Sequence, residues 1–221
     1  MKIHVIRTGV LSVNTLVVET GDKKCFVVDP AACRLSFDES KITDYLRNNK
    51  LECTAVVLTH THFDHIMGIR PLIKAFPQAK VAVHTLEAGE LQNPPGPMNS
   101  SVINFFGAGD LLDMVAQQPS ANVNLENGDS LSLLGSSSGL ENWKVIHTPG
   151  HSPGSICLFN QKENQLISGD TLFDYGGYGR TDMYSGDENQ IMHSLSMLKD
   201  IIPQGTLVYP GHDSFGFPFS K

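Results

Sequence analysis

The chain has 221 residues, of which 40% are apolar and 18% are charged, so it has the length and composition of one large globular domain. Sixteen basic residues against twenty-three acidic ones give a net charge of −7. This balance disfavours a nucleic-acid partner, because a phosphate backbone is bound by basic surfaces. We therefore expect a single domain over residues 1–221 with no nucleic-acid partner.

No apolar run approaches the length of a membrane span, and Met1–Arg7 lacks the apolar core of a targeting segment. The four cysteines show no C-x-x-C spacing, and three of them lie in apolar, strand-like runs. We therefore expect buried thiols rather than a disulfide framework, no membrane association and a cytoplasmic location. The cysteines are Cys25, Cys33, Cys53 and Cys157.

Three strands are expected in the first thirty residues, with turns at Gly9 and at Gly21-Asp22. The third strand runs into a turn that carries an acid, Asp29, at the end of the strand. The expected strands are Ile3–Ile6, Val13–Glu19 and Lys24–Val28.

A helix should follow, because Ser36 and Glu39 have the spacing of a capping box and Ile42, Tyr45 and Leu46 would form its apolar face. Alternating strands and helices then complete the first half of the chain. They are a buried strand ending at Leu58, a helix with Ile66, Ile69 and Ile73 on one face, a strand at Lys80–His84 and a short helix from Thr85.

Residues 93–121 interrupt this alternation with the sequence Pro94-Pro95-Gly96-Pro97 and a series of apolar side chains. We expect Val102–Val115 to be mostly helical and to lie over the functional site as an insertion or lid. An alternative use of its apolar face is the interface of a homodimer.

The second half is expected to contain short strands, one long helix with Asp187 as its N-cap, and a last strand. No interdomain linker separates the halves, which suggest two similar layers packed face to face. The predicted strands are Ser130–Leu134, Trp143–His147, Ser155–Phe159, Gln165–Ser168 and Thr206–Tyr209, and the helix is Asp187–Ile202.

A cluster of ligand-type residues follows the strand that ends at Leu58. His60, His62, Asp64 and His65 lie within six positions, on an expected strand-to-helix turn where their side chains can converge. Imidazole and carboxylate are the ligands that zinc and similar divalent ions prefer. A chance concentration of histidines in a surface loop is a much weaker explanation, so we predict a metal site here.

Three other apolar strands end in residues of the same kind, at His151, Asp170 and His212. Singly, each has an ordinary explanation as a turn or cap residue. Together with the first cluster they make seven ligand groups, more than one tetrahedral ion needs. Two metal ions about 3.5–4 Å apart, sharing one carboxylate, would account for all seven.

The order His60-x-His62-x-Asp64-His65, then His151, Asp170 and His212, resembles the metallo-β-lactamase superfamily over essentially the whole chain. The resemblance implies an α/β fold, a four-layer αββα sandwich of two mixed sheets with the metals at one edge. It also implies that His60, His62 and His151 hold one metal, that Asp64, His65 and His212 hold the other, and that Asp170 bridges them. Asp29 matches an acid that supports the ligands in this family.

Within the superfamily, the stretch Ile167–Phe173 followed by Gly179-Arg180-Thr181-Asp182 looks most like the glyoxalase II group and its short relatives. That resemblance implies a hydrolase of small thioesters or esters with two Zn²⁺ ions, although iron or manganese would suit the same ligands. Glyoxalase II continues into a helical domain that helps to bind glutathione, whereas this sequence ends soon after His212. Glutathione specificity is therefore not implied.

The expected reaction uses a hydroxide between the metals, with Asp64 orienting it or accepting its proton. An alternative reaction is that of the persulfide dioxygenases, which share this framework and use one iron, here held by His60, His62 and His151. Arg180 is the best candidate for binding a substrate carboxylate, although an ion pair with Asp182 would explain it equally well. Tyr175 and Tyr178, in the same glycine-rich loop, are candidates for the pocket lining.

Overall fold

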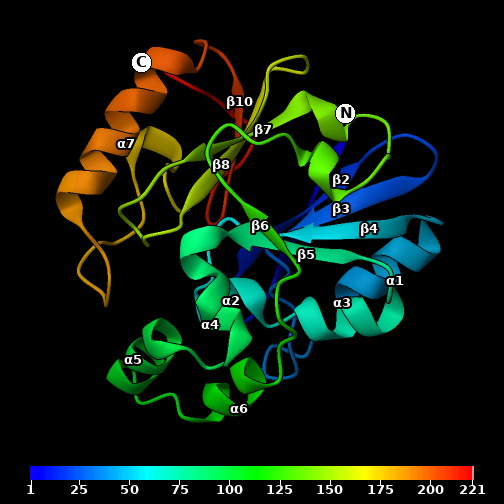
Figure 1. Cartoon of the computed structure of the whole chain (residues 1–221), viewed down its shortest axis with the longest axis vertical. Coiled ribbons are helices and arrows are strands. Elements are labelled where there is room, and N and C mark those ends of the chain that lie inside the picture. The colour runs from blue at the N-terminus through cyan, green and yellow to red at the C-terminus, as the bar shows by residue number, and fades with distance from the viewer. Residues whose placement is uncertain (221) are drawn as a thin grey trace.

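Two mixed β-sheets lie face to face at the centre of the molecule, with helices on both outer faces (Figure 1). This arrangement is seen in a computed structural model that describes residues 1–220. It confirms the predicted four-layer α/β sandwich. Among the described residues, no helix is long and apolar enough to cross a membrane.

The first sheet contains six strands in chain order, antiparallel from β1 to β3 and parallel from β3 to β6. Its strands are β1 (Ile3–Thr8), β2 (Val13–Glu19), β3 (Lys24–Val28), β4 (Glu52–Val57), β5 (Lys80–His84) and β6 (Val123–Leu125). The helices of this half are α1 (Lys41–Asn48), α2 (Phe63–Ile66), α3 (Ile69–Ala75), α4 (Ala88–Gln92), α5 (Pro97–Phe105) and α6 (Asp110–Ala116), with a 3₁₀ turn η1 (Thr85–Glu87).

The second sheet has five strands in the order β11-β10-β9-β8-β7, and only β9 and β10 run parallel. Helix α7 (Glu188–Ile201) covers its outer face (Figure 1). The strands are β7 (Trp143–His147), β8 (Ile156–Asn160), β9 (Gln165–Gly169), β10 (Leu207–Pro210) and β11 (Phe217–Pro218). Three further 3₁₀ turns are η2 (Leu131–Leu134), η3 (Leu140–Asn142) and η4 (Asp174–Gly176).

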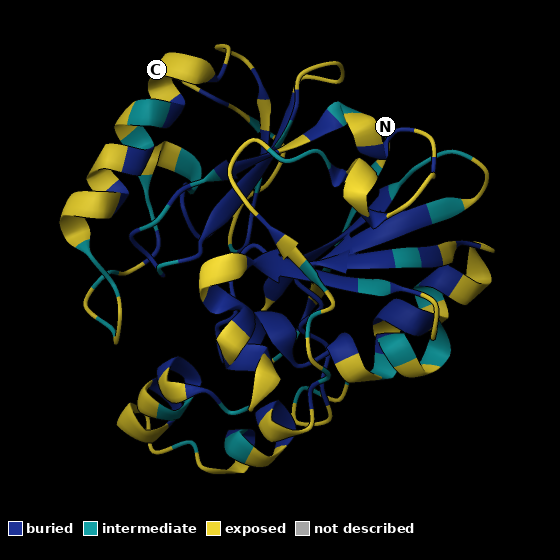
Figure 2. Cartoon of the chain, viewed as in Figure 1, coloured by how far each residue is buried: buried dark blue, intermediate teal, exposed yellow. Residues whose placement is uncertain are grey.

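Alternating side chains of the first sheet's strands enter two separate cores, one on each face, which is why both faces of this sheet are buried. Phe26 and Val28 of β3 face the second sheet, where the rings of Phe26 and Trp143 meet edge to face with centroids 5.7 Å apart. Cys25 and Val27 of the same strand face the helices. Figure 2 shows the strands almost entirely buried and the exposed residues on the outer helices and loops.

The predicted strand at Ser130–Leu134 is wrong, because Leu131–Leu134 forms the 3₁₀ turn η2. Leu131 and Leu134, three residues apart, are buried, whereas Leu133 is half exposed. A spacing of three suits a 3₁₀ turn, in which side chains i and i+3 eclipse, and not the two-residue period of a strand.

The start predicted for the first helix is also wrong. Helix α1 begins at Lys41 after Ser40. Ser36 instead lies in a loop held by the Asp38 carboxylate, which accepts from the backbone N–H groups of Gly9 and Cys33 at 2.9 Å each.

The insertion at 93–121 contains the two helices α5 and α6, which confirms its helical character. Most of its apolar side chains are buried against the core beneath them, namely Met98, Val102, Ile103, Leu111 and Met114. Only Phe105 and Phe106 remain largely exposed, at 73% and 55%. The greater part of its apolar surface therefore belongs to the core of the same chain.

Candidate metal centre

All seven predicted ligands lie in one buried cluster at the carboxyl ends of the strands. His60 follows β4, His151 follows β7, Asp170 directly follows β9 and His212 follows β10. The carboxyl ends of adjacent parallel strands share one edge of a sheet, so residues far apart in sequence meet there. Helix α2 adds Asp64 and His65 and has His62 as its N-terminal cap residue.

Three histidines form the first group of the cluster, His60, His62 and His151, whose ligand atoms lie within 4.8 Å of one another. Nδ1 of His62 faces Nε2 of His151 at 2.8 Å. The side chains are at most 6% exposed. A small cation therefore has three nitrogens available in a dry environment.

The second group consists of Asp64, His65 and His212, again with ligand atoms within 4.8 Å of one another. Nε2 of His65 lies 3.3 Å from Nε2 of His212 and 3.5 Å from Oδ2 of Asp64. Nε2 of His212 lies 3.3 Å from the same carboxylate oxygen.

Asp170 lies between the two groups and touches both. Its Oδ2 atom is 3.5 Å from Nε2 of His151 and 3.6 Å from Nε2 of His212. Its Oδ1 atom is 3.6 Å from Nε2 of His65. One carboxylate oxygen therefore faces a ligand atom from each group.

Three buried atoms of the cluster have no hydrogen-bond partner among residues 1–220: Nε2 of His60, Nε2 of His62 and Oδ1 of Asp170. Leaving such atoms unsatisfied costs about 1–3 kcal/mol each, and metal coordination would satisfy ligand atoms of this kind. Gly211 keeps the space open, because a Cβ atom there would lie 2.2 Å from Oδ1 of Asp170 and 2.8 Å from Cε1 of His65. The donor set and its packing fit one or two divalent ions.

Hydrogen bonds to the far side of three rings orient them toward the cluster. His60 Nδ1 donates to the Thr59 hydroxyl at 3.1 Å, and that hydroxyl donates to Asp29 at 2.6 Å. His65 Nδ1 donates to the same Asp29 carboxylate at 3.0 Å. His151 Nδ1 donates to the carbonyl of Arg180 at 2.8 Å. In each case Nε2 is left pointing into the cluster, as metal-ligating histidines require.

Asp29 is therefore in direct contact with the cluster through His65. Its carboxylate also accepts from the backbone N–H of Thr59 at 2.8 Å. Ligand atoms of Asp29, His60 and His65 also lie within 4.8 Å of one another, which makes a third possible group. The Asp29 oxygens already accept hydrogen bonds, so this acid acts as a support for the two histidines.

Protonation differs between the groups. Burial lowers the pKa of His60 and of His62 well below the usual value, and the neighbouring imidazoles lower it further. These rings are neutral, the form that binds metals.

In the second group, burial opposes the charge on His65, but Asp64, Asp170 and Asp29 outweigh it and raise the pKa of His65 to about 10. Burial also opposes charge on His212, and its hydrogen bond to Asp64 nevertheless raises its pKa. Burial would raise the pKa of Asp64, yet His65 and His212 hold it well below its usual range. The second group is stabilised by opposite charges.

Glu87, which was not among the predicted site residues, is a carboxylate only 2% exposed that joins two ligand-bearing loops. It accepts from the backbone N–H and the hydroxyl of Thr61, between His60 and His62, at 2.6 and 2.8 Å. It also accepts from the Ser152 hydroxyl, beside His151, and from the Gly154 N–H at 2.9 Å. No motif marks these partners, since they lie 26 to 67 residues from Glu87 along the chain.

The insertion is attached to the same loop. The side-chain amide of Asn99, in α5, donates to the carbonyl of Thr61 at 2.8 Å. The buried carboxylate of Glu90 accepts from the backbone N–H groups of Met98 and Asn99 at 3.0 and 3.3 Å. The first turn of α5 therefore packs directly behind the metal-binding turn.

The predicted substrate contacts are engaged with other residues. Arg180 donates two parallel hydrogen bonds to Asp182, at 2.7 and 2.8 Å, and its guanidinium lies 5.8 Å from the centre of the Phe106 ring. The pair with Asp182 raises the pKa of Arg180. Tyr178 donates to Glu188 at 2.7 Å, and Tyr175 is fully exposed.

Comparison with known proteins agrees with this geometry. The metallo-beta-lactamase superfamily profile matches residues 8–212. A hydroxyacylglutathione hydrolase of Prochlorococcus marinus is 30% identical over 95% of this chain and 69% of its own length. The probable metallo-hydrolase YqgX of Bacillus subtilis is 30% identical over 86% of this chain and 81% of its own length. The hydroxyacylglutathione hydrolase of Vibrio parahaemolyticus is matched over only 60% of its length.

Solved structures extend the likeness to the fold. The BLEG-1 B3 metallo-beta-lactamase superposes with a TM-score of 0.81 at 30% identity, over 98% of this chain and 94% of that one. The protein TTHA1623, solved in a di-iron-bound form, superposes with a TM-score of 0.75 at 28% identity, over 97% and 94%. The match over most of its length, together with the two sheets and the histidine–aspartate cluster, shows that this chain belongs to the metallo-β-lactamase superfamily.

Proposed function

We propose that the cluster holds two divalent metal ions and that the protein hydrolyses small thioesters or esters, as glyoxalase II does. The observation that supports this most strongly is the pair of ligand groups with Asp170 between them. A single ion would leave the second buried group of one acid and two histidines without a purpose. The hydroxyacylglutathione hydrolases among the relatives favour the same reaction class.

In this proposal His60, His62 and His151 hold one ion and Asp64, His65 and His212 the other. Asp170 contributes to both. Zinc suits these nitrogen and oxygen donors, and iron or manganese would also be accepted by them. Ions bound there would lower the pKa of a bound water toward neutrality and so supply hydroxide at working pH.

Asp64 is the residue assigned to proton handling. Its buried carboxylate belongs to the second ligand group, so it is placed to orient the attacking water and is the acceptor that we propose for its proton. A thiolate leaves without strong acid assistance, so a thioester needs no further acid. The four cysteines are buried, and a nucleophilic side chain has no role in this scheme.

We propose that the insertion, residues 93–121, acts as a lid. Substrate would enter beside it. Phe106 gives it an exposed apolar edge, and Arg180 packs against that ring from the opposite loop. Arg180 would bind an anionic group of the substrate after exchanging Asp182 for it, with Tyr175 and Tyr178 beside it. We further propose a cytoplasmic location, in keeping with four free buried thiols, and a homodimer through Phe105 and Phe106 as the competing use of the edge.

Two other reactions are alternatives on the same fold. ETHE1 from Myxococcus xanthus shares the fold, with a TM-score of 0.71 at 24% identity, and the persulfide dioxygenase reaction would need only the first ligand group. The 30% identity to the BLEG-1 B3 metallo-beta-lactamase is an argument for β-lactam hydrolysis. Neither reaction explains the charged second group better than thioester hydrolysis does.

The deciding experiment is a substrate panel on protein of measured metal content. It contains a hydroxyacyl-glutathione thioester, a neutral aryl ester, a chromogenic cephalosporin and glutathione persulfide with an oxygen electrode. We expect thioester hydrolysis with the highest kcat/KM and no oxygen uptake. Oxygen consumption on the persulfide, or cephalosporin turnover exceeding thioester turnover, would replace this proposal with the corresponding alternative.

A further inference from the structure

A groove of about 550 Å³ lies on the outer surface of the first sheet's helical layer, between α1, α3 and α6. It contains none of the seven candidate metal ligands. Four of the residues that line it are cations, and Glu39 is the single acid among them. The cations are Arg34, Arg47, Arg70 and Lys74. In a chain of net charge −7, this concentration of positive charge is local and unusual.

None of these four side chains forms an ion pair with an acid of residues 1–220. All four are exposed. Within the described part of the chain, Arg70 is the only one whose side chain has a hydrogen-bond partner, the side-chain amide oxygen of Gln117 across the groove. No acid of the described residues neutralises these four cations, and the one partner present is the neutral amide of Gln117, so their charges are available to an anion.

Helix stability explains only part of this pattern. Arg47 and Lys74 lie in the last turns of their helices, where a cation is favourable. Arg70, however, lies in the first turn of α3, where the helix dipole disfavours a cation, and it repels Lys74 four residues later. Arg34 lies in a loop. Two of the four charges therefore need another reason to be in this groove.

We propose that the groove is a binding site for an organic anion with adjoining phosphate groups, of the class of a nucleoside diphosphate. Arginine forks bind phosphate oxygens in pairs, and the cations come from three separate segments, which suits an extended anion. The volume is that of an ordinary small-molecule site. Met67, Pro71 and Met114 add apolar surface for the organic part.

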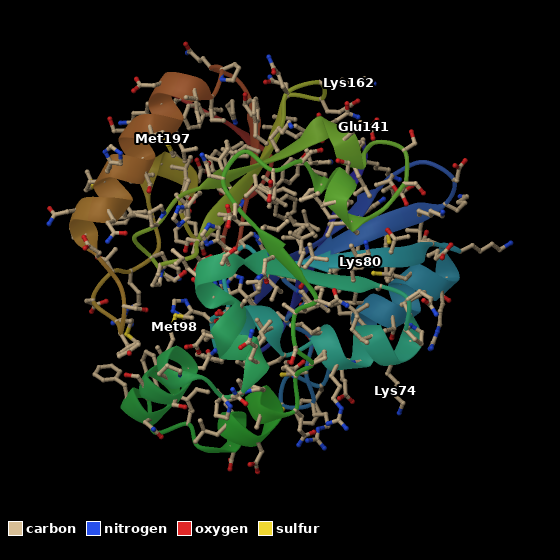
Figure 3. All side chains as sticks on the ribbon, in the orientation of Figure 1. Lys74, Lys80, Met98, Glu141, Lys162 and Met197 are labelled. Atoms are coloured by element: carbon tan, nitrogen blue, oxygen red, sulfur yellow. The ribbon has the colours of Figure 1, made fainter. Side chains whose placement is uncertain are left out.

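The test is calorimetric titration of the metal-loaded protein with ADP, pyrophosphate and adenosine at low ionic strength. The variant Arg47→Ala/Arg70→Ala removes two groove charges at exposed helix positions, where alanine favours folding. Lys162→Ala/Lys199→Ala is the matched control, since it removes two charges elsewhere. Figure 3 shows Lys162 on the opposite side of the molecule from Lys74, which points outward from α3.

We expect ADP to bind the wild-type protein and the control within twofold of each other, and the groove variant at least tenfold more weakly. Adenosine should not bind, and pyrophosphate should lose affinity in the groove variant as ADP does. The proposal fails if ADP does not bind, or if both double variants lose affinity equally, which would indicate general electrostatic attraction. It also fails if the groove variant binds as well as the wild-type protein, because the phosphates would then be bound at the metal centre.

Discussion

The two ligand groups of the metal centre share one cluster but are held by different forces. His60 and His62 of the first group are neutral imidazoles among other imidazoles. In the second group, neighbouring carboxylates favour the protonated forms of His65 and His212, and the pKa of His65 rises to about 10. The rings of His60 and His151 are therefore oriented by direct hydrogen bonds to neutral groups, the Thr59 hydroxyl and the Arg180 carbonyl, whereas charge compensation holds the second group together.

This difference shows why so many acids surround one half of the centre. His60 and His62 can receive a divalent ion without losing protons, but His65 and His212 of the second group must exchange protons for metal. Asp170 is the residue that both groups share. We therefore expect different effects from three kinds of change. They are the loss of Asp170, the loss of the support of the first group, and the loss of charges away from the centre.

The largest effect is expected for Asp170→Ala. The variant loses the carboxylate that faces both groups, so we expect at least one metal equivalent and about three orders of magnitude of kcat to be lost, in line with the loss of a catalytic metal. Elemental analysis and initial rates measure the two quantities. Asp200→Ala, on the exposed surface of α7, is the control for loss of one carboxylate. Full metal content in Asp170→Ala would contradict the shared role.

Glu87→Gln should produce the next largest effect, because it weakens the support of the first group only. A glutamine side chain cannot accept all the hydrogen bonds from Thr61, Ser152 and Gly154 that the carboxylate accepts. Supporting partners of metal ligands typically account for about 10–100-fold in metal affinity.

Competition with a chromogenic chelator measures the affinity of the more weakly and the more tightly bound metal in Glu87→Gln. Glu126→Gln, at an exposed position, should leave both affinities unchanged. If both metals of the Glu87 variant bind as in the wild-type protein, Glu87 supports the fold and not the ligand loops.

A histidine pair outside the cluster predicts a pH dependence of stability. His84 stacks on His147 with ring centroids 4.1 Å apart, and burial and then the charge of His147 lower the pKa of His84 to about 4. Unfolded chains bind the proton near pH 6.5. The unfolded state therefore holds more protons between pH 6.5 and 4, and stability falls as the pH falls through that window.

The expected size is at most about 3 kcal/mol at pH 4, since each pKa unit corresponds to about 1.4 kcal/mol. Urea unfolding of wild-type protein and His84→Asn measures it as a difference, in which the unchanged metal ligands cancel. The wild-type free energy of unfolding should fall more steeply than that of His84→Asn. Parallel pH curves for the two proteins would refute this, and His193→Asn, exposed on α7, should follow the wild-type curve.

Arg180→Ala should have the smallest effect. If Arg180 binds the anionic part of a substrate, KM for an anionic thioester rises severalfold while a neutral ester and the metal content are unaffected. Asp182→Asn, which frees Arg180 from its partner, should lower KM for the same anionic substrate. Equal loss with both substrate classes would mean that Arg180 holds its loop against Asp182 and Phe106.

Much of the centre could be predicted because its ligands follow apolar strands directly. A buried strand is recognisable from its residues, and a histidine or aspartate at its end must lie at the sheet edge, as His60, His151 and Asp170 do. The fold followed from the same strands and from the family resemblance. The two layers were expected from the two strand-and-helix halves, and the structure shows Phe26 and Val28 on the face of the sheet opposite to Val27.

Other features depend on contacts between distant segments and so leave no local signal. Leu131–Leu134 forms a 3₁₀ turn in place of the expected strand. Two of its leucines are buried in the core between the sheets by residues far from them in the sequence. The first helix starts later than its capping pattern predicts, because Asp38 bonds to Gly9. Glu87 resembles any acid at the start of a short helix until Ser152 and Gly154 are seen beside it.

The most direct test of the account is the metal content of protein purified without chelators, measured by elemental analysis beside Asp64→Ala and His65→Ala. We predict about two equivalents per chain in the wild-type protein and about one in either variant, because Asp64 and His65 belong to the second group and not to the group of His60, His62 and His151. One equivalent in all three proteins would contradict the account, since the second group would then not be a metal site.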